Sequence, residues 1–428
     1  MHRLIFGFFG RLADTFYRWE LLGGEVPADG PLILVANHPN GLVDPLMVDR
    51  VAGRRFRMLA KAPIFSVPVL GWMAKQVGAI PVYRKLDGDD TRQNRDAFAA
   101  AHQALAEGQV LFLFPEGISH NEPQLQPLKS GAARIALGAE AARGYGLGLR
   151  IVPVGITYRD KTRFGSAAAI EIGAPIDVAA FAEDYQRDPW PAVEALTAAI
   201  EDGVRRLTIN LDRWEDLPLV RLAEKILGRR DAHVVKRLRA MAATGRARQQ
   251  EDPEAFAALR QRLAAFQLQL DELGLEVNHL DARYSPAAVV RFVLRNLLAV
   301  VIGLPLAVAA GLLYLPPRLL VRSAGRRWSE SEDVLVSVKF LAGALLFPLW
   351  HAGIVLTAWT SFGGPWAALL GVLLPFAYLY SRYFFLHRVR ALREIRAFLA
   401  APFQRERRRR LRQLRDELSA VLWGLRLS

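Results

Sequence analysis

Asn37-His38-Pro39-Asn40-Gly41-Leu42-Val43-Asp44 directly follows Leu32 to Ala36, an apolar run with the length and composition of a buried strand. A second polar stretch, Leu113-Phe114-Pro115-Glu116-Gly117-Ile118-Ser119-His120, begins at the end of another such run, Val110 to Phe114. Folding gives ionisable residues little reason to lie just beyond buried strands. In open α/β sheets, ligands bind outside the carboxyl ends of the strands. The two stretches therefore predict a binding or catalytic site at such an edge.

Short apolar runs alternate with helical periodicity between residues 31 and 175. The expected strands are 31–36, 56–60, 79–83, 109–114, 150–157 and 168–173, and the expected helices lie near 44–52, 64–77, 89–106 and 128–143. Strands that alternate with helices indicate an α/β sheet flanked by helices. We expect this α/β domain to span residues 25–210.

Helical patterns flank the expected α/β domain on both sides. Residues 1–24 combine an apolar patch with arginines, which predicts an amphipathic helix lying in a membrane interface. An ordinary terminal helix packed on the domain is the alternative. Residues 211–290 are expected to form a helical insertion or connector, since the part from Arg237 to Arg262 lacks a strong apolar face. We expect no cleavable signal peptide, because a long apolar core and a small-residue cleavage site are both missing.

Residues 291–381 are predicted to form membrane segments. Asn296 to Leu315 is 20 residues long without a charge, about the length of helix that crosses a bilayer core. Phe340 to Ser381 is 42 residues long without Asp, Glu, Lys or Arg, and Gly363-Gly364-Pro365 interrupts it. The longer stretch predicts a two-span hairpin, in which His351 would hydrogen-bond between the spans. Pro305 and flanking arginines favour a re-entrant or interfacial element for the shorter stretch, with a third full span as the alternative.

The charge of the chain is concentrated at its end. The net charge is +14, and residues 382–428 contain 13 Arg but only 4 acidic residues. This basic amphipathic tail follows long apolar segments, so we expect it to meet anionic membrane lipids and expect no nucleic-acid partner. Both ends of the hairpin are basic, and by the positive-inside rule we expect the α/β domain to lie on the cytoplasmic face of a membrane. Without cysteine, the chain cannot form disulfides, thiolate metal sites or a cysteine nucleophile.

Four blocks follow one another along the expected α/β domain: Asn37-His38 with Asp44, Gly78 to Arg84, Phe114 to Gly117, and Ile151 to Gly155. Together they resemble the ordered blocks of the PlsC-type glycerophospholipid acyltransferases. The resemblance covers residues 28–175. The stretch from Glu116 to His120, followed by Pro127-Leu128-Lys129-Ser130-Gly131, is most similar to the branch that acylates glycerol 3-phosphate and dihydroxyacetone phosphate. The added C-terminal membrane segments are also similar to that branch.

The resemblance implies a membrane-bound O-acyltransferase of phospholipid synthesis. Such an enzyme moves a fatty acyl group from acyl-CoA or acyl carrier protein to a hydroxyl of glycerol 3-phosphate or 1-acyl-glycerol 3-phosphate, and the acyl thioester is a co-substrate rather than a cofactor. His38 would act as the general base, while Asp44 would fix the imidazole and stabilise the imidazolium. The family pattern has four residues between this pair, and here there are five. Pro39 has no titratable group, so we expect Pro39 and Gly41 to shape a loop that restores the contact.

A second group of residues is expected to bind the acceptor: Arg84, Glu116, Gly117, Lys129, Lys61 and Ser119. Arg84 follows a buried-type strand, where a guanidinium favours a phosphate partner, with a structural ion pair as the alternative. Gly117 would let backbone N–H groups approach an oxyanion. Lys129 lies near an expected helix start, which favours phosphate, with a surface lysine as the alternative. The resemblance implies that Glu116 orders this site. Metal ligands at helical or turn spacing are missing, so no metal is expected.

A catalytically weakened lipid-binding or tethering protein that keeps the fold is the second hypothesis. The five-residue spacing between His38 and Asp44 favours it. The presence of Arg84, Glu116 and Gly117 argues against it, because a protein that only binds or tethers need not keep an acceptor site. His120 lies close in sequence to Glu116 and Gly117. It could take part in the acyl-transfer site or have no role there.

Overall fold

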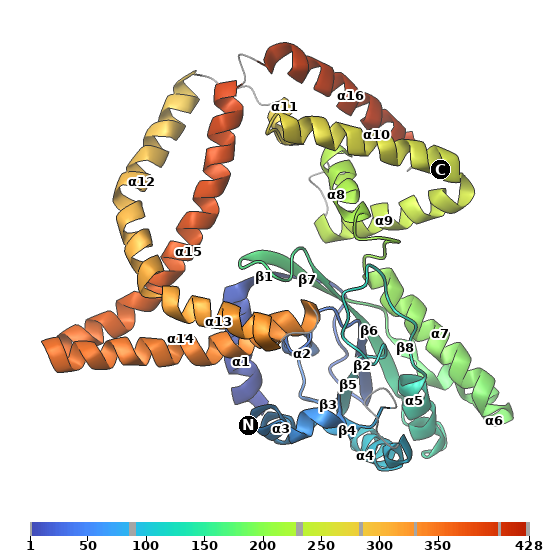
Figure 1. Ribbon diagram of the computed structural model, residues 1–428. Helices are drawn as coiled ribbons and strands as arrows, with labels where there is room; N and C mark the ends of the chain where they lie inside the picture. The colour runs from blue at the N-terminus through green and yellow to red at the C-terminus, as the bar shows by residue number, and fades with distance from the viewer. Residues whose placement is uncertain are drawn as a thin grey trace. The chain divides into compact units, whose positions relative to one another are not determined.

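The computed structural model describes residues 2–84, 91–227, 234–281, 286–328, 332–400 and 404–424 (Figure 1). The chain divides into two compact units. The first comprises Met1–Asp212 with Glu330–Ser337, and the second comprises Arg213–Ser329 with Val338–Ser428. The first unit contains the sheet, and the described part of the second is helical.

An eight-stranded sheet forms the centre of the first unit. Its strands are β1 (Tyr17–Gly23), β2 (Leu32–Ala36), β3 (Phe56–Lys61), β4 (Ile80–Val82), β5 (Val110–Leu113), β6 (Arg150–Tyr158), β7 (Ser166–Ile172) and β8 (Ile176–Asp177). The order is β1-β7-β6-β2-β5-β3-β4, and β8 pairs with the start of β6. The strands β4, β3, β5, β2 and β6 are parallel, whereas β7 and β8 run antiparallel to β6. This arrangement confirms the predicted α/β class.

Helices cover both faces of the sheet, as a mainly parallel sheet requires. The helices of this unit are α1 (His2–Phe16), α2 (Val43–Ala52), α3 (Pro68–Gln76), α4 (Asn94–Ala106), α5 (Gly131–Ala141), α6 (Ala182–Arg187) and α7 (Pro189–Leu207). Helices α4, α5 and α7 share one core with Ile33 of β2 and Leu111 of β5. On the other face, Phe6 of α1 packs edge to face on Phe56, which in turn packs on Phe112 of β5. The carboxyl ends of β2, β5 and β6 lie at the same edge of the sheet, where the loops after β2 and β5 begin.

The N-terminal segment differs from the helix expected over residues 1–24. Helix α1 ends at Phe16, and Tyr17–Gly23 is edge strand β1, paired in parallel with β7 along its whole length. Ile5, Phe6 and Ala13 are buried, so one side of α1 packs on the domain. The prediction of a helix was wrong beyond Phe16, because pairing with a distant strand overrides local propensity.

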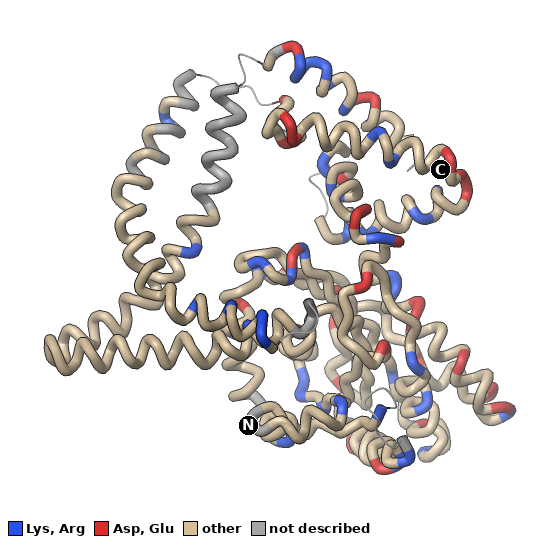
Figure 2. The backbone as a smooth tube through the Cα atoms, in the orientation of Figure 1, with Lys and Arg blue, Asp and Glu red and all other residues tan. Residues whose placement is uncertain are grey.

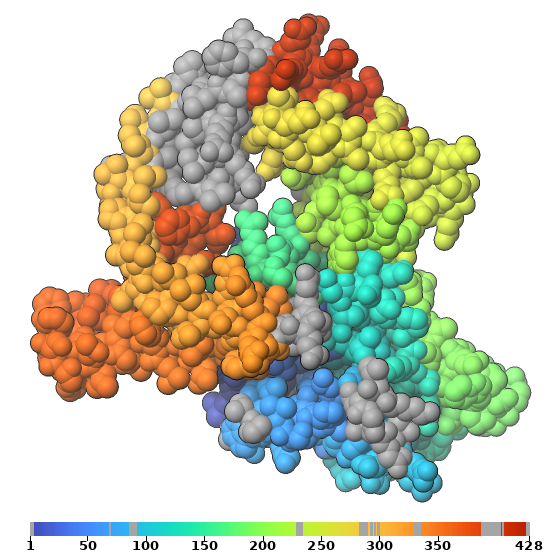
Figure 3. Space-filling model, viewed as in Figure 1, coloured from blue at the N-terminus to red at the C-terminus, as the bar shows by residue number. Residues whose placement is uncertain are grey.

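The predicted connector and the basic tail share one core in the second unit. Its helices α8 (Asp216–Leu227), α10 (Pro253–Glu272) and α11 (Val277–Leu280) pack with α16 (Arg405–Gly424), and α9 (Val234–Glu251) packs on α8 and α10. Figure 3 shows α10 and α16 in direct contact. Leu411, Leu418 and Leu422 of α16 are buried there beside Leu263 and Phe266 of α10. The boundary expected between connector and tail therefore does not separate two cores, and the tail uses its apolar face for helix packing.

Four long helices make up the apolar part of the chain: α12 (Pro286–Leu313), α13 (Leu315–Trp328), α14 (Glu332–Phe362) and α15 (Gly364–Ala400). Two stretches, Leu335–Phe362 and Gly364–Leu386, are long and apolar enough to cross a membrane. Figure 2 shows how few charged residues the stretch Leu335–Phe362 of α14 carries. The break between them at Gly363 confirms the predicted interruption. Helix α12 continues through Pro305, and a 53° bend to α13 follows Leu313.

His351 joins the apolar helices through both ring nitrogens. Its Nε2 lies 3.0 Å from the carbonyl oxygen of Gly371, and its Nδ1 lies 2.9 Å from the hydroxyl of Tyr314. A carbonyl only accepts, so Nε2 carries the proton and Nδ1 accepts from Tyr314. The predicted hydrogen bond between α14 and α15 is confirmed.

Gly155 of β6 provides a test of this packing. A Cβ atom there would lie 2.4 Å from the carbonyl oxygen of Leu207 in α7, and a backbone atom cannot move aside cheaply. We expect Gly155→Ala to destabilise the protein by about 1–3 kcal/mol, the usual cost of overpacking, and thermal unfolding would measure it. Gly7→Ala is the control, since nothing lies within 4 Å of the added atom. Equal unfolding midpoints for both variants would contradict this close approach.

Candidate active site

His38 and Asp44 are in contact despite the five residues between them. Nδ1 of His38 lies 2.9 Å from Oδ2 of Asp44. The Asp44 side chain is fully buried in the first turn of α2, whereas 17% of the His38 side chain is exposed. A tight turn absorbs the intervening residues: Val43 N–H donates to the Asn40 carbonyl at 3.0 Å, and Gly41 has φ of +40°. The loop therefore returns the carboxylate to the imidazole.

The contact with Asp44 fixes the tautomer of His38. A carboxylate only accepts, so Nδ1 carries a proton, and in the neutral ring Nε2 keeps its lone pair. The imidazole ring also stacks on the ring of Phe114, with centroids 3.6 Å apart and planes 7° apart. An oriented neutral imidazole of this kind can take a proton from a hydroxyl group.

Two further donors hold the Asp44 carboxylate. The backbone N–H of Asn40 donates to Oδ2 at 2.7 Å, and the hydroxyl of Tyr158 donates to Oδ1 at 2.7 Å. Burial raises the pKa of Tyr158 well above its usual value, and the nearby Asp44 charge adds to this effect. Tyr158 therefore stays protonated and can donate. With His38, three donors compensate a carboxylate that has lost its contact with water.

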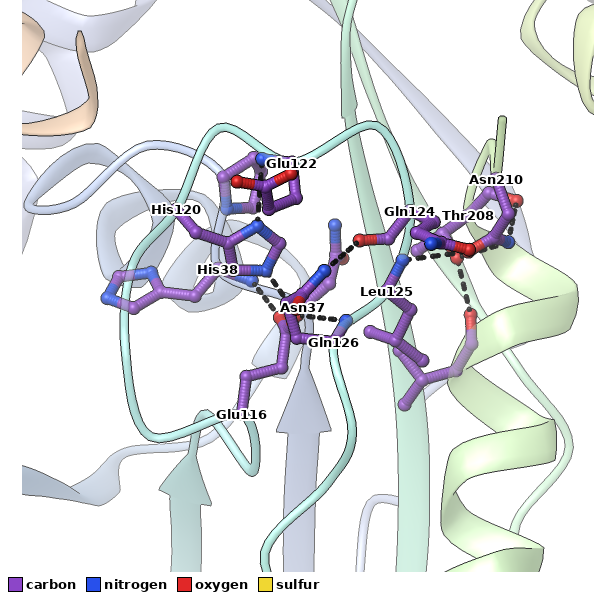
Figure 4. Close-up of polar contacts among 12 residues, drawn as sticks. Asn37, His38, Glu116, His120, Glu122, Gln124, Leu125, Gln126, Thr208 and Asn210 are labelled. Carbon is purple, nitrogen blue, oxygen red and sulfur yellow. Dashed lines mark hydrogen bonds and ion pairs between the residues drawn. The ribbon is translucent and has the colours of Figure 1, made fainter. Parts of the chain in front are cut away.

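Glu116 ties the loops after β2 and β5 together (Figure 4). Its Oε1 accepts from the backbone N–H of His38 at 2.9 Å, and its Oε2 accepts from the backbone N–H of Gln126 at 2.9 Å. Oε2 also contacts Nε2 of His120, whose backbone N–H donates to the His38 carbonyl at 3.2 Å. The two polar stretches that follow buried strands thus form one connected site.

His120 is engaged through both ring nitrogens. The backbone N–H of Glu122 donates to Nδ1 at 3.1 Å, so Nε2 carries the proton and donates to Glu116. Neither nitrogen of His120 is available to accept a proton from a substrate in this arrangement. His38 is therefore the histidine of this site that can act as a base.

Three of the predicted acceptor residues come together. Arg84 Nη1 donates to the carbonyl of Gly117, and a Cβ atom on Gly117, where φ is +72°, would lie 2.8 Å from Lys129 Nζ. Two cations thus meet near the N-terminus of α5, a combination that suits a phosphate group. Ser119 is half-buried in the same loop, and Lys61 is exposed at the carboxyl end of β3.

Among the residues that the structure describes, no three His, Asp or Glu side chains are grouped as metal ligands.

The sequence interpretation missed the residues behind Asp44. Tyr158 ends β6, which is parallel to β2, so a polar residue at the end of the predicted strand 150–157 could have been assigned to the same edge. Tyr17, whose hydroxyl accepts from Asn40 Nδ2 at 3.1 Å, had no such signal. Tyr17 is the first residue of β1, which runs parallel to β7 and therefore antiparallel to β6. The amino end of β1 thus lies at the same edge of the sheet as the carboxyl end of β6.

Replacement of Glu116 tests the loop connection without reference to any reaction. In Glu116→Ala the backbone N–H groups of His38 and Gln126 lose a charged acceptor, a bond worth about 1.5–3 kcal/mol. We expect amide hydrogen exchange in both loops to become roughly 10- to 100-fold faster, measured by mass spectrometry of peptides.

Glu140→Ala is a matched control, because Glu140 likewise accepts from backbone N–H groups, those of Leu147 and Leu149. It should accelerate exchange near residues 147–149 and leave the loops at His38 and Gln126 protected. Unchanged protection of these two loops in Glu116→Ala would contradict the connection.

Known proteins are similar to parts of this chain, and the family match covers the region that contains His38, Asp44 and Glu116. Residues 22–157 match the family model described as Acyltransferase. An uncharacterised acyltransferase of Schizosaccharomyces pombe is 25% identical over 312 residues, which cover 52% of this chain and 46% of that protein. Glycerol-3-phosphate O-acyltransferase 2 of Saccharomyces cerevisiae is 32% identical over 134 residues, 31% of this chain and 18% of that protein. A chloroplastic 1-acyl-sn-glycerol-3-phosphate acyltransferase of Brassica napus is 31% identical over 123 residues, 28% of this chain and 34% of that protein.

These alignments span less than half the length of each sequence relative. Among solved structures, the 1-acyl-sn-glycerophosphate acyltransferase PlsC of Thermotoga maritima matches with a TM-score of 0.34 and 20% identity, over 46% of this chain and 78% of that one. The region matched by the family model contains His38, Asp44 and Glu116. Residues 22–157 therefore carry an acyltransferase domain of the PlsC type.

Proposed function

We propose that this protein is a membrane-bound O-acyltransferase of phospholipid synthesis. It would move a fatty acyl group from acyl-CoA or acyl carrier protein to a hydroxyl of glycerol 3-phosphate or 1-acyl-glycerol 3-phosphate. The observation that carries the proposal is the contact of His38 with Asp44 at the edge where Arg84 and Lys129 approach Gly117. Relatives named for these two acceptors each match about a third of the chain.

His38 would act as general base and then as general acid. Its Nε2 takes the proton of the acceptor hydroxyl as that oxygen attacks the thioester carbonyl carbon. Asp44 stabilises the imidazolium that forms, because Oδ2 accepts from Nδ1. Collapse of the tetrahedral intermediate forms the ester, breaks the carbon–sulfur bond and returns the proton to the thiolate. A thioester is electrophilic enough that no covalent enzyme intermediate is needed.

The phosphate of the acceptor would bind beside this base. Arg84 offers a planar guanidinium and Lys129 a flexible ammonium, both near Gly117. Lys61 and Ser119 lie at the same edge and complete the proposed acceptor residues. Glu116 is anionic and would serve by holding the loops rather than by touching phosphate.

A membrane setting suits the acyl donor and the acylated product, since both carry apolar chains. Two helices are long and apolar enough to cross a bilayer. The charges that flank them favour a catalytic domain on the cytoplasmic face.

The tethering alternative loses the feature that favoured it. The extra residue between His38 and Asp44 does not separate their side chains. A folded wild-type protein that releases no thiol from acyl-CoA or acyl carrier protein with any glycerophosphate acceptor would restore that alternative.

Substitution of His38 is the direct test of the reaction. We expect His38→Ala to lower acyl transfer by about 10²–10⁴-fold, the usual contribution of a positioned base. Thiol release from acyl-CoA, with glycerol 3-phosphate and 1-acyl-glycerol 3-phosphate in competition, would measure the rate and identify the acceptor. His102→Gln is the control, because His102 lies on α4 with its ring against Gly138. Wild-type rates in His38→Ala would exclude His38 as the base.

Membrane orientation can be tested separately. Reporters fused before Met1 and after Ser428 should both read the cytoplasmic side, and one inserted at Gly363 should read the opposite side. This outcome requires that the bent pair α12–α13 does not cross the bilayer as a span. Opposite readings at the two ends would show that it does.

A further inference from the structure

A buried group of side chains lies behind the His38–Asp44 pair. The Tyr158 hydroxyl donates to Oδ1 of Asp44 at 2.7 Å, and neither the Asp44 side chain nor Asn40 is exposed. The Tyr158 ring packs against Tyr17 and Trp19 of β1, with centroids 5.1 Å and 5.8 Å apart. The Tyr158 ring, and with it the direction of the hydroxyl, is therefore held by two rings from β1.

The two oxygens of Asp44 have separate partners. Oδ2 accepts from His38 Nδ1 and from the backbone N–H of Asn40, whereas Oδ1 accepts from Tyr158. A carboxylate held at one oxygen can still rotate about its Cβ–Cγ bond. A donor on the other oxygen stops that rotation and so fixes the direction in which Oδ2 meets the imidazole.

We propose that Tyr158 is a positioning residue for the proposed general base, acting through Asp44. The inference rests on the proposed function. Tyr158 need not touch either substrate, and its hydroxyl sets the carboxylate plane, which in turn sets the imidazole. Asn40 and Tyr17 support the arrangement from the other side, because Asn40 Nδ2 donates to the Tyr17 hydroxyl at 3.1 Å.

The longer loop between His38 and Asp44 makes a second anchor for the Asp44 side chain useful, and Tyr158 of β6 provides it. Five residues separate Asp44 from His38, so the loop constrains the pair less tightly than the family spacing would. Strand β6 pairs with β2 in a fixed register up to Ala36 and Val154. Tyr158 therefore couples Asp44 to the same sheet that carries His38, independently of the loop.

A double-mutant cycle tests whether Tyr158 acts through Asp44. We expect Tyr158→Phe to lower kcat roughly 10- to 100-fold, as loss of a hydrogen bond to a charged group predicts, while KM for donor and acceptor stays within about twofold. In the Asp44→Asn background the same change should lower kcat little further. Effects that multiply in the double variant, or a KM that rises with kcat unchanged, would overturn the proposal.

Tyr185→Phe is the matched control, since it removes a phenol hydroxyl on α6, where Tyr185 packs against the core shared by α4, α5 and α7. Its kcat should equal that of the wild type. If Tyr158→Phe does not fold, Tyr17→Phe takes its place, because it removes the partner of Asn40. We then expect a smaller fall in kcat that again disappears in Asp44→Asn, and a fall of equal size in both backgrounds would overturn the proposal.

A measurement without turnover separates this inference from the proposed function. In protein labelled with ¹⁵N-histidine, the His38 Nδ1 proton signal is assigned by its loss in His38→Gln. We expect that proton to exchange with water faster in Tyr158→Phe than in the wild type or Tyr185→Phe. A wild type without acyl transfer but with this difference would refute only the proposed reaction. An active wild type whose Nδ1 proton exchanges equally fast in all three proteins would refute the role of Tyr158.

Discussion

The buried carboxylate of Asp44 is the constraint on which the site depends. Removing a carboxylate from water costs several kcal/mol unless donors replace the lost solvent. Three segments supply them here: the end of β2 through His38, the following loop through Asn40, and the end of β6 through Tyr158. These donors can meet only if β2 and β6 are neighbours that end at the same edge. The topology of the sheet is therefore a requirement of the site.

Glu116 applies the same principle on the other side of His38. It is buried, and it satisfies backbone N–H groups from its own loop and from the loop after β2. The imidazole is consequently held at three points, by Asp44 at Nδ1, by Glu116 at its backbone and by Phe114 at its ring face. Arg84 and Lys129 both approach Gly117, the neighbour of Glu116. Glu116 thus links the loop of His38 to the loop that contains Gly117 and Lys129, and Arg84 reaches Gly117 from the segment after β4.

Burial on both faces explains how much of the fold could be predicted. The strand expected at 150–157 is Arg150–Tyr158, because a strand covered on both sides is an unbroken apolar run. Edge strand β1 gave no such run, since only two of its seven residues are buried. His38, Asp44, Arg84 and Lys129 lie in stretches that could be identified from the sequence. The contact of Tyr17 with Asn40 could not be predicted, because it depends on the position of β1 in the sheet. In α16, leucines at helical spacing among the arginines fit either a membrane surface or a partner helix, and only the position of α10 decides for helix packing.

The spacing between a base and its carboxylate matters only through the geometry that it allows. His38 is oriented by Glu116 and Phe114, neither of which lies within the loop. Asp44 is placed by the first turn of α2 and by Tyr158. The loop has only to connect two side chains that other elements already hold, and the turn closed by Val43 and Asn40 around Gly41 takes up the additional residue. A departure from the family spacing is therefore weak evidence against general-base chemistry wherever both partners are anchored to the sheet.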